Sequence, residues 1–100
     1  MLLYNVTTIV EDSIAQKWQD WMQTKHIVDV MNTGLFSSFN FLKVLDSPNE
    51  GQTFCAQFIT ENREAYEEYL QNHAPKLREE AVTLFKEQAL SFRTLMEYID

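Results

Sequence analysis

Apolar residues recur at every second position in four segments of the chain, which is the pattern of β-strands whose side chains alternate between two faces. The four segments are residues 2–11, 36–45, 52–60 and 90–99. In the second segment the alternation is irregular, and either a bulge or burial on both faces explains it. The sequence therefore predicts four strands.

Apolar residues at helical spacing occupy the stretches between these strands. Trp18, Trp21 and Met22 form a bulky stripe in a helix that begins near residue 14 and ends at Gly34. An acidic helix is predicted over residues 62–72, and Pro75 is well placed to begin another.

The order strand, helix, strand, strand, helices, strand favours right-handed crossovers, which place all the helices on one side of the sheet. We therefore expect a single α+β domain over residues 1–100, a ferredoxin-like sandwich with a four-stranded antiparallel sheet. The helix-facing core is predicted to contain Tyr4, Val6, Val10, Phe54, Phe58, Phe92 and Met96, packed on Trp18, Met22, Leu70, Ala81 and Phe85.

The opposite face of the sheet is left bare by this arrangement and is partly aliphatic. It is predicted to carry Leu3, Ile9, Ile59, Leu95 and Ile99 among Asn5, Thr7, Gln57 and Arg93. An exposed apolar patch of this kind usually marks an interface. We therefore expect a homodimer that pairs through the bare sheet face.

Composition narrows the range of partners and locations. The net charge of −7 repels phosphate backbones and anionic membranes. The third strand displays Thr53, Cys55, Gln57 and Ile59, without the aromatic rings that RNA-recognition sheets use, so no nucleic acid partner is expected. No apolar run is long enough to cross a bilayer, and the N-terminus does not have the pattern of a signal peptide. The single cysteine favours a reducing, cytoplasmic location.

Several short motifs carry a family resemblance over nearly the full chain. They are Trp18-x-x-Trp21-Met22, the segment His26 to Met31, Thr33-Gly34-x-Phe36 and His73-Ala74-Pro75-x-Leu77-Arg78. They resemble the dimeric α+β barrel proteins, and within that superfamily a family of short bacterial proteins that is described only as a domain of unknown function. The resemblance implies two sheets packed face to face in a homodimer, and it implies no particular activity.

Two histidines are candidates for chemistry. His26 and Asp29 lie three residues apart near a helix end, so they can share a face as a proton-transfer pair. Alternatively, His26 hydrogen-bonds the helix terminus or the adjoining loop. His73 precedes a helix break, where its ring can satisfy free carbonyls or bind a ligand. The two histidines and one cysteine do not form a recognisable metal site, and we expect no cofactor.

Polar residues of the sheet supply the other candidates. The resemblance implies that Asn5, Trp21 and His73 are the nearest matches to the residues used by some haem-degrading and quinone-forming monooxygenases of the superfamily. Both tryptophans also fit the apolar stripe of the helix. Arg93 and Glu97 are predicted to join Gln57 and Thr7, either in a polar network across the dimer interface or around a small anionic ligand. Cys55 is expected to be a small packed hydrophobe.

Two functional hypotheses follow. The first is a homodimeric binding or interaction module without catalysis, which the aliphatic bare face and the scattered polar residues favour. The alternative is a cofactor-independent or haem-using monooxygenase-like enzyme with a pocket between helices and sheet, near Asn5, Trp21, His26 and Arg93. A ligand-sized cavity beside Asn5 and His26 would favour the enzyme.

Overall fold

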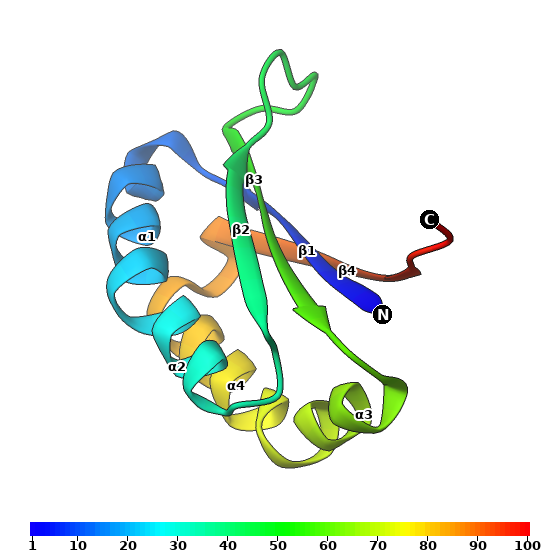
Figure 1. Cartoon of the computed structure of the whole chain (residues 1–100). Coiled ribbons are helices and arrows are strands. Elements are labelled where there is room, and N and C mark those ends of the chain that lie inside the picture. The colour runs from blue at the N-terminus through cyan, green and yellow to red at the C-terminus, as the bar shows by residue number, and fades with distance from the viewer.

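A computed structural model describes the whole chain, residues 1–100, as one antiparallel sheet with helices on one side (Figure 1). The strand order across the sheet is β2-β3-β1-β4. Along the chain the elements are β1 (Leu2–Val10), η1 (Asp12–Ile14), α1 (Ala15–Trp21), η2 (Met22–His26), α2 (Ile27–Asn32), β2 (Ser38–Lys43), β3 (Gln52–Thr60), α3 (Arg63–Asn72), α4 (Ala74–Phe85), η3 (Lys86–Gln88) and β4 (Ala89–Glu97). The predicted ferredoxin-like α+β fold is confirmed.

The strands pair without interruption. β1 lies between β3 and β4 and is antiparallel to both, so β2 and β4 are the edge strands. β2 pairs one to one with β3 from Ser38 opposite Ile59 to Lys43 opposite Phe54. This regular register contains no bulge, and β2 is mostly exposed because it lies at the edge.

The segments α1, η2 and α2 form one continuous helix with a wider turn inside it. α1 and α2 are α-helical, and η2 between them is a π-helical turn over Met22–His26. The helix ends as predicted, because Gly34 adopts a φ of 77° and its N–H donates to the Met31 carbonyl at 3.1 Å.

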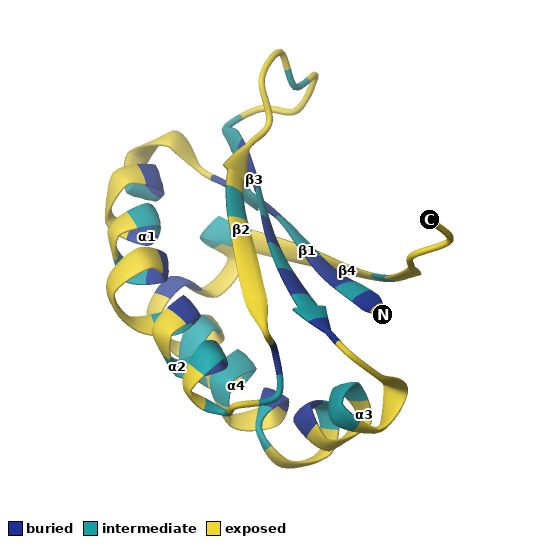
Figure 2. Cartoon of the chain, viewed as in Figure 1, coloured by how far each residue is buried: buried dark blue, intermediate teal, exposed yellow.

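The core lies between the sheet and the helices, as the buried positions in Figure 2 show. Seven of the predicted core residues belong to the buried cluster: Tyr4, Val10, Trp18, Met22, Phe54, Phe58 and Phe85. Phe92 and Met96 do not, since they are 59% and 43% exposed. None of the helices combines the length and apolar character needed to cross a membrane.

A side-chain cap begins α3. The Asn62 Oδ1 atom accepts a hydrogen bond of 2.9 Å from the Ala65 N–H, one of the donors that the first helical turn leaves without a partner. We expect Asn62→Ala to lower the free energy of unfolding by about 1 kcal/mol. Urea denaturation measures this change. Asn62→Asp keeps the acceptor oxygen and should stay close to the wild type, and equal losses in both variants would contradict the capping role.

Candidate functional site

The face of the sheet opposite the helices, here called the bare face, carries alternate residues of all four strands. The strand registers place on it Leu3, Asn5, Thr7 and Ile9 of β1, Ser38, Asn40 and Leu42 of β2, Thr53, Cys55, Gln57 and Ile59 of β3, and Leu90, Phe92, Thr94 and Met96 of β4. No helix of the chain covers this face (Figure 1).

A chain of side-chain hydrogen bonds crosses the middle of the bare face. Asn40 Nδ2 donates to Gln57 Oε1 at 3.4 Å, and Gln57 Nε2 donates to Asn5 Oδ1 at 3.3 Å. Asn5 Nδ2 then donates to Thr7 Oγ1 at 2.9 Å, and this hydroxyl lies 3.5 Å from the Cys55 Sγ atom. Gln57 and Thr7 therefore belong to a polar network with Asn5 at its centre, but the predicted members Arg93 and Glu97 are not part of it.

Large apolar side chains flank this network. Leu42 on one edge strand is 48% exposed, and Leu90, Phe92 and Met96 on the other are 53%, 59% and 43% exposed. The bare face therefore combines a hydrogen-bonded centre with apolar borders at both edges.

The predicted orientation of the last strand is wrong. Arg93 pairs with Val6 and Leu95 pairs with Tyr4, so these residues face the helices, as does Glu97 opposite Leu2. The even-numbered residues of β4 face away from the helices instead. The physical reason is the register with β1, which fixes the faces of an edge strand independently of its own alternation.

A cleft opens between α4 and β4 on the helix side. Its volume is about 520 Å³, and its lining includes Trp18, Phe85 and Ala89. At its neck, Arg78 and Arg93 belong both to the cleft and to a smaller inner cavity of about 50 Å³. The inner cavity has room for one or two water molecules, whereas the cleft has the size of a small-molecule pocket.

Trp21 and His26 meet at the inner cavity because of the π-helical turn. Residues five apart in an α-helix point about 140° apart around the axis. The wider turn over Met22–His26 reduces this angle, and the two ring centroids lie 4.8 Å apart. The Nδ1 atom of His26 is buried without a hydrogen-bond partner. Burial lowers the pKa of His26 to about 4, with an opposing effect of Glu80 and Asp29.

The two arginines at the neck have free hydrogen-bonding capacity. The Arg78 Nη2 atom donates to the Tyr4 hydroxyl at 3.0 Å, whereas the Arg93 side chain has no hydrogen-bond partner. Neither guanidinium forms an ion pair with a carboxylate. Beside them, the hydroxyls of Thr8 and Ser91 lie 2.9 Å apart and also line the inner cavity.

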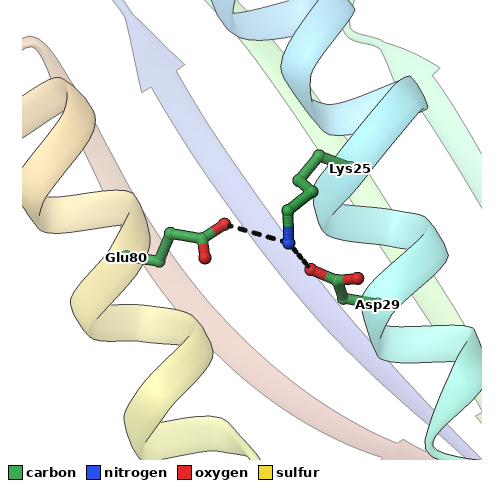
Figure 3. A network of polar contacts seen from close by, with 3 residues as sticks. All are labelled: Lys25, Asp29 and Glu80. Atoms are coloured by element: carbon green, nitrogen blue, oxygen red, sulfur yellow. Dashed lines mark hydrogen bonds and ion pairs between the residues drawn. The ribbon is translucent and has the colours of Figure 1, made fainter.

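Asp29 is not paired with His26. The Lys25 Nζ atom bonds the Asp29 carboxylate and lies 3.7 Å from Glu80 Oε1 of α4 (Figure 3). The hydrogen bond with Asp29 is the main cause of the raised pKa of Lys25. This network joins the continuous helix α1–η2–α2 to α4 at the protein surface, while His26 faces the inner cavity.

The remaining candidates lie apart from one another. His73 stands between α3 and α4, and its ring stacks on Tyr69 at 6.4 Å. Asn5 and Trp21 lie on opposite sides of the sheet, so the structure does not bring together the three residues that the resemblance singled out. Trp21, His26 and Arg93 do share the inner cavity. Sequence reasoning left out Arg78, Tyr4 and Ser91 from this site.

Structural comparison identifies solved proteins with the same fold. The chain is similar to an ethyl tert-butyl ether D (EthD) family protein from Bacillus halodurans C-125, with a TM-score of 0.73, 11% identity, and coverage of 99% of this chain and 100% of that one. The chain is also similar to HapK from Hahella chejuensis, with a TM-score of 0.73, 12% identity, and coverage of 99% of this chain and 93% of that one. A dimeric ferredoxin-like protein from an uncultured marine organism is similar with a TM-score of 0.72 and 13% identity, and the match covers 99% of this chain and 94% of that one. At these identities the likeness concerns the fold.

Sequence comparison then places the chain in a family. Residues 1–99 match the family described as domain of unknown function (DUF4286), and the chain belongs to this family. No curated protein matches the sequence. The expected membership of a family of unknown function with a ferredoxin-like fold is thus confirmed.

Proposed function

We propose that the protein is a homodimeric binding module. Two copies pair through their bare faces, and each copy binds a small molecule in its cleft without catalysing a reaction on it. The proposal includes the cytoplasmic location predicted from the single cysteine.

The observation that carries the pairing is the orientation of β4. Its three large apolar residues on the bare face, Leu90, Phe92 and Met96, point away from the helices of their own chain and remain largely exposed. Each Å² of apolar surface left in water costs about 25 cal/mol relative to burial. A second copy of the same face would cover these side chains through a two-fold, self-complementary contact.

The centre of the bare face is also suited to burial. Asn5, Gln57 and Asn40 are already linked by hydrogen bonds within the chain, so a partner sheet would bury amides that each have at least one partner. One of the fold neighbours is described as dimeric, which further supports the proposal.

Light scattering coupled to size exclusion tests the pairing. We expect a mass twice that of the 11.8 kDa chain at micromolar concentration. A strictly monomeric mass at that concentration would contradict the proposed assembly.

The composition of the cleft favours binding over catalysis. Enzyme sites bring an acid or base together with a group that orients it. His26 is the one titratable imidazole of the inner cavity, and it has no carboxylate partner there. Arg78, Arg93 and Ser91 are groups that bind and position a ligand.

The alternative is the monooxygenase-like enzyme, with or without haem. The close contact between the rings of Trp21 and His26 beside a cavity is the observation that favours it. Titration with a quinol or with haem, followed by absorbance, separates the two functions. Turnover of the quinol would establish the enzyme, whereas saturable ligand binding without turnover supports the binding module.

A further inference from the structure

We propose that the cleft takes a small organic carboxylate, whose acid group binds Arg78 and Arg93 at the neck and whose apolar body lies along α4. This inference deepens the proposed binding function and rests on it, but it does not depend on the pairing of the sheets.

The first argument is the unused capacity of the two guanidinium groups. Each arginine carries five N–H donors. Arg78 uses one of them, toward the Tyr4 hydroxyl, and Arg93 uses none within the chain. Elsewhere in the molecule, Lys25 and Arg63 pair with carboxylates of the chain itself. The two cations at the neck are therefore available to an anion from outside.

The second argument is the local charge. The chain carries 15 acidic and 8 basic residues, yet no carboxylate lines the inner cavity. The cleft contains Arg78, Arg93 and Lys86 against the single acid Glu87. The cleft is thus locally positive in a protein whose overall charge is negative. An anion is therefore attracted to the cleft and repelled by the rest of the surface.

The third argument concerns the kind of anion. The planar fork of a guanidinium matches a carboxylate in two parallel hydrogen bonds. The rest of the cleft is largely apolar, with Ala81, Val82 and Phe85 on α4 opposite Ala89. This lining suits a hydrocarbon or aromatic body more than a free phosphate. Glu87 at the cleft also opposes a second negative charge on the ligand.

A matched pair of probes tests the inference. Benzoate and benzamide have nearly the same shape and differ in charge, so we would titrate the full chain with each and follow its ¹H–¹⁵N spectrum. We expect benzoate to shift the amides around Arg78 and Arg93 saturably, and benzamide to bind at least about tenfold more weakly. Arg93→Gln should weaken the binding of benzoate by about tenfold or more, because it removes a charge that pairs with the carboxylate. The variant should still fold, since the exposed Arg93 side chain has no partner within the chain.

The controls separate the failure of this inference from that of the proposed function. Arg63→Gln removes an arginine of α3 that pairs with Glu67, and it should leave benzoate binding unchanged. Equal binding of benzoate and benzamide, insensitive to Arg93→Gln, would overturn the carboxylate while the binding cleft stands. Inorganic phosphate that binds as tightly as benzoate would also overturn it. If neither probe shifts these amides at millimolar concentration, the inference is wrong, and neutral fragments followed on the same resonances then test the cleft itself.

Discussion

Phe92→Glu is expected to turn the proposed dimer into a folded monomer. Phe92 is 59% exposed within the chain and lies on the bare face, beside Thr7 on the neighbouring strand. In the proposed assembly the substitution removes a buried aromatic ring and places a carboxylate in its position. Because the contact is symmetric, the loss occurs twice in each dimer.

The expected size of this effect is large. Burial of one phenylalanine contributes about 1.5–3 kcal/mol, so two copies weaken the dimer by at least about 3 kcal/mol, or more than about a hundredfold in Kd. Sedimentation velocity over a concentration series measures the change. Leu84→Glu is the matched control, because Leu84 on α4 is similarly exposed, at 52%, and lies on the helix side. Equal effects of the two substitutions would contradict the assignment of the interface.

The second large effect concerns pH and His26. Burial, aided by Arg93 and Lys25, lowers the pKa of His26 to about 4 in the folded protein, against an ordinary value of 6.5. Between these two values the unfolded chain binds a proton at His26 and the folded chain does not. The stability that arises from this difference in proton binding is therefore fully present above about pH 6.5, and it is lost as the pH falls toward about 4.

The difference between the two pKa values of His26 sets the size of the expected change in the free energy of unfolding. His26 should contribute a loss of about 2 kcal/mol in the free energy of unfolding between about pH 7 and about pH 4.5. Urea denaturation at both values, at one fixed protein concentration, measures it. His26→Phe and His26→Gln remove the titrating group, so both should show a smaller loss than the wild type by this amount. Identical pH dependence in wild type and variants would show that His26 is not the group responsible.

Clear sequence periodicity predicted the elements well. The strand predicted over residues 52–60 has the observed bounds, Gln52–Thr60, because its alternation is regular and a turn precedes it. The end of the first helix at Gly34 followed from the conformational freedom of glycine. These features depend on neighbouring residues, and the sequence contains that information directly.

The faces of β4 could not be predicted in this way. The rule that apolar residues face the core assigned Phe92 and Met96 to the inside, but the rule assumes that a chain buries its apolar surface by itself. Pairing with β1 places Arg93 and Leu95 on the helix side instead. A strand whose apolar side faces away from its own helices is the arrangement expected when a partner molecule supplies the burial.

The candidate site depended on features that sequence spacing does not encode. Arg78 and Arg93 are brought together by the way α4 lies beside an edge strand. His26 meets Trp21 because of a π-helical turn, and an α-helical wheel places these two rings apart. The one signal available in the sequence was the scarcity of arginines in an acidic chain, since two of its three arginines, Arg78 and Arg93, fall in the last helix and the last strand.

The central claim is that two copies touch through the bare face, and isotope-filtered NMR on a mixture of labelled and unlabelled chains tests it most directly. The claim predicts intermolecular NOEs that involve the methyl groups of Leu42 and Met96 and the ring of Phe92, all exposed within one chain. Intermolecular NOEs confined to the helices, or none at a concentration where these resonances are well resolved, would contradict it.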